Sequence, residues 1–138
     1  MRSGETALCD TGPLVALFDS NDSAYAKCRA GFGSYSGGLV TTWPVLAESF
    51  YLLRKQHLRE LLWELVSNGG IDIAGPVLGD LPRIQSLMVQ YADLPMDFAD
   101  ASLVALSERL NIVRVFTIDR RDFRIYRPRH TRVFEIFP

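Results

Sequence analysis

The residues of this chain that could do chemistry are mainly carboxylates, and two of them end apolar stretches. Asp10 follows the stretch ALC, and Asp119 ends the stretch VRVFTI. Short apolar runs of this kind are typical of buried strands. In a parallel sheet covered by helices, ligands bind beyond the carboxyl ends of the strands. We therefore expect Asp10 and Asp119 to lie at the same edge of one sheet.

Glu48 is the third carboxylate that needs an explanation. It lies in the stretch VLAESFYLL, where helical spacing would put Val45 and Leu52 on its own face. A lone charge in so apolar a stretch is costly unless something pairs with it. A rotation of the helix could instead leave Glu48 in solvent, and the sequence leaves this alternative open.

Two pairs of aspartates share a spacing of three residues. Asp97 and Asp100 lie in MDFADAS at the start of a predicted helix, and Asp119 and Asp122 lie in TIDRRDF. Each pair could be an N-cap and an acid in the first helical turn. Asp10 could likewise only cap the helix that opens after it. Each capping interpretation stays open for its own residue. A purely structural role for all these acids, however, would require every one of the interpretations to be correct at once.

Carboxylates that gather at one sheet edge repel one another, and each raises the pKa of its neighbours unless a cation neutralises them. Oxygen ligands without histidine or cysteine favour Mg²⁺ or Mn²⁺ over zinc. One or two such ions would bind a phosphodiester, activate water and stabilise the leaving oxygen. The acids therefore indicate metal-dependent hydrolysis of a nucleic acid.

Arginines crowd the last quarter of the chain, although its net charge is only −1. The cluster consists of Arg114, Arg120, Arg121, Arg124, Arg127, Arg129 and Arg132. Arginine forms bidentate contacts with phosphates and stacks on bases, which suits a nucleic-acid partner. The alternative is a solvated surface paired with Asp119, Asp122 and Glu135, and the charge pattern alone leaves both open.

Strands and helices alternate along the chain. We expect strands over 6–10, 39–42, 71–75, 113–119 and 131–137, and helices over 13–18, 20–32, 43–56, 58–68, 78–93 and 97–111, with an arginine-rich turn or short helix before the last strand. This order predicts an α/β fold, a three-layer α/β/α sandwich around a mainly parallel sheet.

Length and composition predict a single domain over residues 1–138. Hydrophobic residues make up 48% and charged residues 22%, as in ordinary globular proteins. No apolar run approaches the roughly 20 residues that span a bilayer, and the N-terminus MRSGETALCD has no apolar signal segment. We expect a cytoplasmic protein with no membrane partner, in which Cys9 and Cys28 are reduced packing residues.

Four motifs in order resemble the PIN domain family, including the VapC-type toxin ribonucleases of bacterial toxin–antitoxin systems. They are LCDTGPLVALFD, a helix carrying AES, DFADASLVALSERL and VFTIDRRDF, and together they span nearly the whole chain. The resemblance implies a PIN-like α/β/α sandwich with Mg²⁺- or Mn²⁺-dependent endoribonuclease activity. It also implies a homodimer and a small antitoxin protein as a partner.

The family's four catalytic acids match Asp10, Glu48, Asp100 and Asp119. Asp97 matches an acid often found before the third, and would complete the metal ligands. The residues that match supporting positions around the site are Thr11, Thr117 and Asp122, and those of the cluster that would hold RNA are Arg120, Arg121, Arg124, Arg127 and Arg129. Relatives often carry histidine where this chain has Tyr25, which would alter the rim of the pocket.

Two other hypotheses remain. The domain could bind RNA or a partner protein without cutting, although all four acids are present. It could also be a phosphoryl-transfer or receiver domain with Asp10 or a neighbour as the phosphoacceptor. The only lysines, Lys27 and Lys55, do not lie at a predicted strand end, where a lysine could bind the phosphoryl group. This argues against a phosphoryl-transfer or receiver domain.

Overall fold

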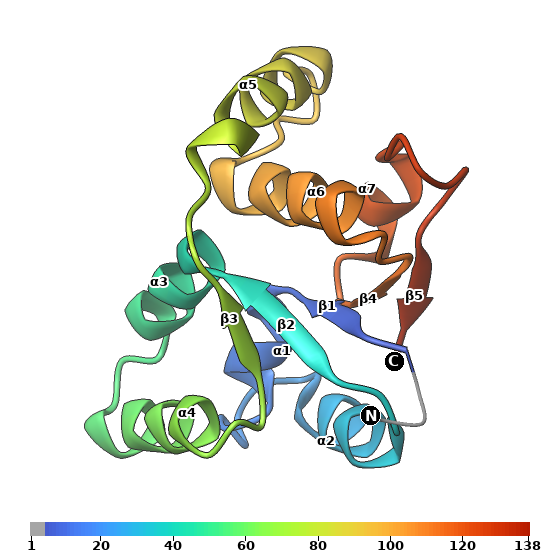
Figure 1. Ribbon diagram of the computed structural model, residues 1–138. Helices are drawn as coiled ribbons and strands as arrows, with labels where there is room; N and C mark the ends of the chain where they lie inside the picture. Colours follow the sequence, from blue (N-terminus) through green and yellow to red (C-terminus); the bar gives the residue numbers. More distant parts are fainter. Residues whose placement is uncertain (1–4) are drawn as a thin grey trace.

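A five-stranded, wholly parallel sheet forms the centre of the computed structural model, which describes residues 5–138 (Figure 1). Its strands are β1 (Ala7–Cys9), β2 (Leu39–Thr42), β3 (Asp72–Ala74), β4 (Arg114–Phe116) and β5 (Glu135–Phe137), in the order β3-β2-β1-β4-β5. Because every neighbouring pair is parallel, all carboxyl ends reach the same edge. The residues before Glu5, which belong to the amino-terminal stretch MRSGETALCD, lie outside the described part of the chain.

The central strand β1 is fully buried because it has neighbours on both sides and helices on both faces. Leu8 lies opposite Val40 on one side and Val115 on the other. All three residues of β1 are inaccessible to solvent. The residue that follows β1 therefore enters the most enclosed part of the carboxyl edge.

Helices cover both faces of the sheet. They are α1 (Thr11–Ala16), α2 (Tyr25–Ser34), α3 (Trp43–Leu52), α4 (Gln56–Ser67), the 3₁₀ helix η1 (Leu78–Asp80), α5 (Leu81–Gln90), α6 (Phe98–Leu110) and α7 (Arg120–Ile125). In Figure 1, α5, α6 and α7 lie on one side of the sheet, and α1, α2 and α4 on the other. The predicted α/β/α sandwich is confirmed, with every strand pair in the described chain parallel.

Helix α6 has clear local signals at both ends. The Asp97 side chain accepts a hydrogen bond from the backbone N–H of Asp100, which caps the first turn. Asn111 ends the helix in the left-handed conformation, with φ of 56°. Between them, every residue from Ala101 to Ser107 is buried. The helix is thus held against the sheet along most of its length, which gives Asp100 a rigid support.

Several predicted boundaries were wrong. The last strand, expected over 131–137, covers only Glu135–Phe137, and the helix expected over 78–93 is the 3₁₀ helix η1 followed by α5, which ends at Gln90. Helix α1 begins at Thr11, two residues before Pro13, because the Asp10 carboxylate caps it. Helix α2 begins at Tyr25 and not near 20–22, since the Asp22 side chain accepts the Ala24 N–H in a local turn. Helix α3 ends at Leu52, so the predicted helix over 43–56 is too long.

Two smaller expectations concern membranes and cysteines. None of the helices in the described residues is long and apolar enough to cross a bilayer. Cys9 and Cys28 are both buried and are not joined in a disulfide. They pack in the core as predicted.

Candidate active site

Asp10 lies at the centre of the carboxyl edge, directly after β1. Its backbone N–H donates to the Phe116 carbonyl at 3.0 Å, which extends the ladder between β1 and β4 by one residue. The carboxylate is buried. Its Oδ1 accepts the Thr11 N–H at 2.8 Å, and its Oδ2 accepts the Thr117 hydroxyl at 2.8 Å. The Thr11 N–H and the Thr117 hydroxyl therefore hold both carboxylate oxygens of Asp10 in place.

Thr117 links the ends of β1 and β4. It follows β4 directly and is inaccessible to solvent. While its hydroxyl donates to Asp10, its oxygen accepts the backbone N–H of Asp119 at 2.9 Å. This one side chain thereby connects the first and fourth predicted acids. The family resemblance predicts Thr117 as a supporting residue, and the structure places it between the two acids.

Asp119 and Asp122 converge with Asp100 from another helix. Asp119 caps α7, and its Oδ1 accepts the Asp122 N–H at 3.2 Å. Each of the three aspartates offers one carboxylate oxygen, and these oxygens lie within 4.8 Å of one another. Asp122, expected only in a supporting position, is therefore part of this carboxylate cluster.

Glu48 and Asp97 approach the site from its two flanks. Glu48 is half-buried on α3 and accepts the Thr11 hydroxyl at 2.6 Å. Thr11 is the residue next to Asp10 in the chain, so it links Glu48 to Asp10. Asp97 is exposed and caps α6. Its charge still raises the pKa values of Asp10 and Asp100, which places it near both. The structure thus gathers all six predicted acids at one edge, with Asp97 already engaged as a helix cap.

Tyr126 is a site residue that the sequence analysis missed. It follows α7 and is inaccessible to solvent. Its hydroxyl donates to Asp100 Oδ2 at 2.8 Å. Burial raises the pKa of Tyr126, as does its hydrogen bond to Asp100, so the phenol stays protonated and acts as a donor. Its position four residues after Asp122, at the end of the same short segment, was the available signal.

Burial dominates the electrostatics of the acids. It raises the pKa of Asp10 to about 6, against the stabilising hydrogen bonds from Thr117 and Thr11. It raises the pKa of Asp100 to about 8, with the charge of Asp10 adding to the effect. The pKa of Asp119 is also raised, first by burial and then by the Asp122 carboxylate. These carboxylates therefore lack enough nearby positive charge to keep their pKa values low.

This donor set fits a hard divalent cation. Among residues 5–138, none of the ion pairs includes Asp10, Glu48, Asp100 or Asp119. Carboxylate oxygens, without histidine or thiolate, are the ligands that Mg²⁺ and Mn²⁺ prefer. A bound cation would favour the ionised carboxylates and so offset the burial and the repulsion that raise these pKa values. The acidic residues are thus equipped to hold such an ion.

The arginine cluster divides into engaged and free side chains. Arg114 pairs with Glu135 at 2.9 Å, as the alternative interpretation of the cluster proposed. The Arg120 guanidinium donates to the Pro138 carbonyl at 2.8 Å. Arg121 is exposed beside Asp119, whose pKa its charge lowers, and Arg124 is exposed in the last turn of α7. These last two are the exposed arginines nearest in sequence to the fourth acid.

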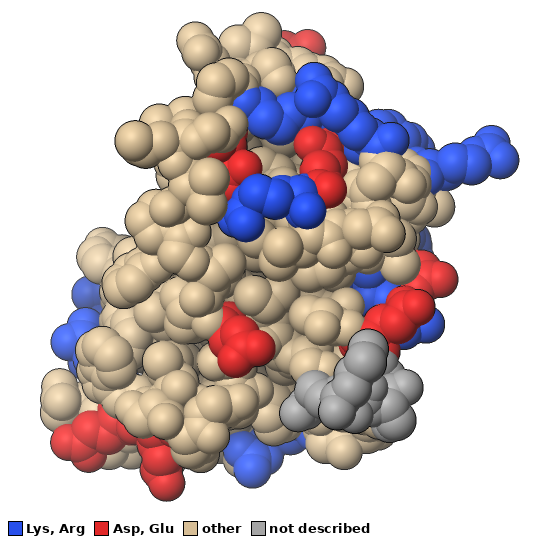
Figure 2. Space-filling model, viewed as in Figure 1, with Lys and Arg blue, Asp and Glu red and all other residues tan. Residues whose placement is uncertain are grey.

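Two further arginines are fixed near α7 by backbone contacts. The Arg127 N–H donates to the Tyr91 hydroxyl, and the Arg129 N–H donates to Glu108, both at 2.8 Å. Their side chains are exposed. Figure 2 shows arginine side chains (blue) gathered over α5, α6 and the segment after α7, with acidic side chains (red) between them. Part of this basic surface is paired, since Arg83 binds Glu108 at 2.8 Å.

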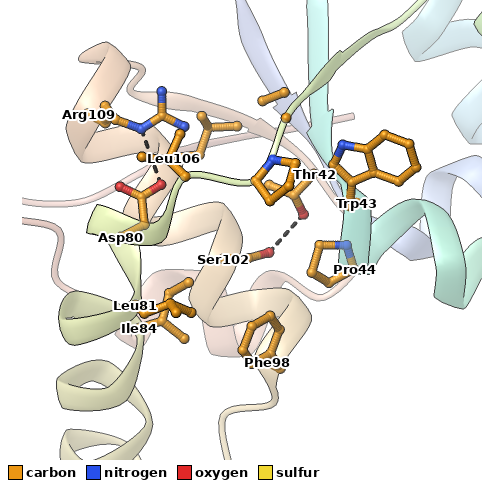
Figure 3. Close-up of a pocket in the computed structure, with 14 residues that line it drawn as sticks. Thr42, Trp43, Pro44, Asp80, Leu81, Ile84, Phe98, Ser102, Leu106 and Arg109 are labelled. Carbon is orange, nitrogen blue, oxygen red and sulfur yellow. Dashed lines mark hydrogen bonds and ion pairs between the residues drawn. The ribbon is translucent and has the colours of Figure 1, made fainter.

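An apolar pocket of about 90 Å³ lies apart from the acids, between α5, α6 and the start of α3 (Figure 3). Trp43, Leu81 and Phe98 line it, and the hydroxyls of Thr42 and Ser102 meet there at 2.7 Å. Ser102 lies two residues after Asp100, so a helix turns it about 200° away. The pocket and the carboxylates therefore use opposite faces of α6.

Known proteins resemble this chain in sequence. The family model described as PIN domain matches residues 7–128. Ribonuclease VapC26 from Mycobacterium tuberculosis is 29% identical over 142 residues, which cover 95% of this chain and 99% of that protein. The sequence match therefore runs through all the motifs that carry the acids.

Solved structures share the fold. VapC20 from Mycobacterium tuberculosis, described as a sarcin–ricin loop cleaving toxin, matches with a TM-score of 0.77 and 16% identity, over 83% of this chain and 91% of that chain. A toxin–antitoxin complex from Klebsiella pneumoniae matches with a TM-score of 0.65 and 18% identity, over 85% and 89% of the two chains. Because the family model spans the first four strands and all six acids, the chain belongs to the PIN domain family.

Proposed function

We propose that this chain is a metal-dependent endoribonuclease and the toxin component of a type II toxin–antitoxin system, formed by a single nuclease domain over residues 1–138. The observation that carries the proposal is the gathering of Asp10, Asp100 and Asp119 at one sheet edge with raised pKa values and, among the described residues, no ion pair to a basic side chain. Such an arrangement is costly for folding alone, and it is useful where a divalent cation binds.

The relatives support this choice of chemistry. The curated relative is named a ribonuclease, and one structural neighbour is described as a toxin that cleaves the sarcin–ricin loop. Another neighbour is a complex of a toxin with its antitoxin. For this chain we infer an RNA phosphodiester as substrate, a small antitoxin protein as partner, a homodimer as assembly and the cytoplasm as location.

We assign the metal ligands to Asp10, Glu48, Asp100 and Asp119, with Asp97 and Asp122 completing or orienting the set. Mg²⁺ or Mn²⁺ would supply positive charge for the phosphoryl transition state and lower the pKa of water. The chain's own contribution is to position these acids. Thr117 holds Asp10 against the start of α7, and Thr11 ties Glu48 to the same strand end.

The RNA backbone would lie along α7 in this proposal. Arg121 and Arg124 are exposed and carry no hydrogen bond to an acid within the described residues, so they are available to phosphates. Arg127 and Arg129 extend the same basic segment. Arg120 is engaged with Pro138 and would shape the segment more than bind RNA.

The test is cleavage of a mixed single-stranded RNA with Mn²⁺ or Mg²⁺, compared with EDTA and with the Asp10→Asn variant. We expect cutting that EDTA stops and that Asp10→Asn lowers by at least about 100-fold, because the acid at the centre of the site loses its charge. Asp72→Asn is the matched control, since Asp72 is exposed at the opposite, amino end of β3. Full activity of Asp10→Asn would contradict the site, and Mn²⁺ binding without cutting would favour a non-catalytic binding module.

A further inference from the structure

Tyr126 joins the two segments that carry the three-carboxylate cluster. Asp100 lies on α6, whereas Asp119 and Asp122 lie at the start of α7. Tyr126 directly follows α7, and its backbone N–H donates to the Asp122 carbonyl at 3.0 Å. Its hydroxyl then crosses to Asp100 Oδ2 at 2.8 Å. The single turn of chain that presents Asp122 therefore also presents the hydroxyl that binds Asp100.

The ring of Tyr126 is held in place by other aromatic rings. Tyr91 packs edge-on against it with 5.2 Å between ring centroids, and Phe123 does the same at 5.2 Å. Phe123 in turn contacts Phe134 at 5.9 Å. Edge-to-face contacts of this kind fix ring orientation. Because the ring is fully buried among them, its hydroxyl has one position relative to α6.

A carboxylate on a helix is free to turn about its last side-chain bond unless something binds one oxygen. In Asp100 the Tyr126 hydroxyl binds Oδ2, and this sets the plane of the carboxylate. The Asp97 side chain, at the start of the same helix, bonds to the backbone N–H of Asp100 and not to its carboxylate. The orientation of the Asp100 carboxylate thus depends on a residue from a different element.

We propose that Tyr126 is a positioning residue that orients Asp100 so that its carboxylate and those of Asp119 and Asp122 bind one divalent cation together. The inference rests on the proposed function, since it concerns the same site. Partners that hydrogen-bond a metal-binding carboxylate typically change metal affinity about 10- to 100-fold when they are removed. Tyr126 acts through Asp100 and has no assigned contact with RNA.

The experiment compares Tyr126→Phe with Tyr91→Phe by calorimetric titration with Mn²⁺ alone. Tyr126→Phe removes only the oxygen that binds Asp100 and keeps the ring contacts. Tyr91→Phe is a matched control, because its hydroxyl is in the same aromatic group but, among residues 5–138, bonds to the Arg127 N–H and not to Asp100. We expect Kd for Mn²⁺ to rise about 10-fold in Tyr126→Phe and by less than about twofold in Tyr91→Phe.

A double-variant cycle separates positioning from loosening of the fold. If Tyr126 acts through Asp100, adding Tyr126→Phe to Asp100→Asn leaves the Mn²⁺ affinity of Asp100→Asn unchanged. Equal weakening by Tyr126→Phe and Tyr91→Phe would overturn the inference, and so would a wild-type Kd in Tyr126→Phe. A wild-type chain that binds no Mn²⁺ would overturn the proposed metal site itself, and this inference with it.

Discussion

The Thr117 hydroxyl donates a 2.8 Å hydrogen bond to Asp10 Oδ2 across 107 positions of sequence. The hydroxyl oxygen of Thr117 also accepts the Asp119 N–H, so one threonine holds the acid at the end of β1 and the acid that opens α7. Both strands lie inside the sheet with a neighbour on each side, and the geometry between the two acids is therefore set by the sheet and not by a loop.

Replacing Thr117 by valine tests this link. Thr117→Val keeps the shape but leaves a buried carboxylate oxygen and a backbone N–H without their partner. We expect the free energy of unfolding to fall by about 1–3 kcal/mol. We expect RNA cleavage to fall about 10- to 100-fold, because removing a hydrogen-bond partner of a metal-binding carboxylate typically lowers activity by this factor. Thr117→Ser retains the hydroxyl and should stay near wild type, and equal losses in both variants would contradict the role.

The raised pKa values predict how stability depends on pH without metal. Burial raises the pKa of Asp100 to about 8 and that of Asp10 to about 6. In the unfolded chain, aspartate titrates near about 3.9. Between these values the folded chain binds more protons than the unfolded chain, so its stability falls as pH rises. Urea unfolding in EDTA should show the largest free energy of unfolding near about pH 4–5 and a decline toward about pH 8.

Asp100→Asn is the control for this pH dependence. The amide cannot ionise, so the part of the decline that belongs to Asp100 disappears, and the curve should be flatter between about pH 6 and pH 8. Asp72→Asn should keep the wild-type slope because Asp72 is exposed at the far edge of the sheet. Parallel curves for wild type and Asp100→Asn would mean that the Asp100 carboxyl titrates normally.

Divalent cations should stabilise the folded chain at about pH 8. Binding to the folded state alone adds about 2.7 kcal/mol when the ion is present at about 100 times its Kd. Thermal unfolding with Mn²⁺ should therefore show a Tm above that in EDTA, by about 6–12 °C. Asp119→Asn should lose most of this shift, since it removes one charge from the three-carboxylate cluster. An equal shift in Asp119→Asn would place the ion elsewhere.

Exposed arginines on α7 should contribute to RNA affinity. In an Asp10→Asn background, which prevents cutting, Arg121→Ala with Arg124→Ala should weaken RNA binding about 10-fold, with a shallower dependence of affinity on salt. The slope should decrease by about 0.7 for each phosphate that the variant no longer neutralises. Lys27→Ala serves as the control, because Lys27 is exposed on α2 beside Arg114, which opens β4 at its amino end. Unchanged RNA affinity and an unchanged salt slope in the arginine variant would show that RNA does not bind along α7.

Much of the fold could be predicted from the sequence because local signals agree with the tertiary structure. The stretch ALC reads as a buried strand and is one, since β1 is inaccessible to solvent. In α6, the cap at Asp97, the apolar face and the stop at Asn111 all lie within the helix itself. The start of α2 was predicted too early because Asp22 caps a turn and not the helix.

Local signals in the sequence do not show which acids contact one another, because these contacts form between segments that are far apart in the chain. The sequence by itself determined the parallel α/β/α order, the strand ends that carry Asp10 and Asp119, and an acid set suited to a divalent cation. The tertiary structure alone brought Asp122 into the carboxylate cluster and placed the Tyr126 hydroxyl on Asp100. The reason is physical: strand and helix signals act over a few residues, whereas contacts between carboxylates depend on how α6 and α7 pack on the sheet.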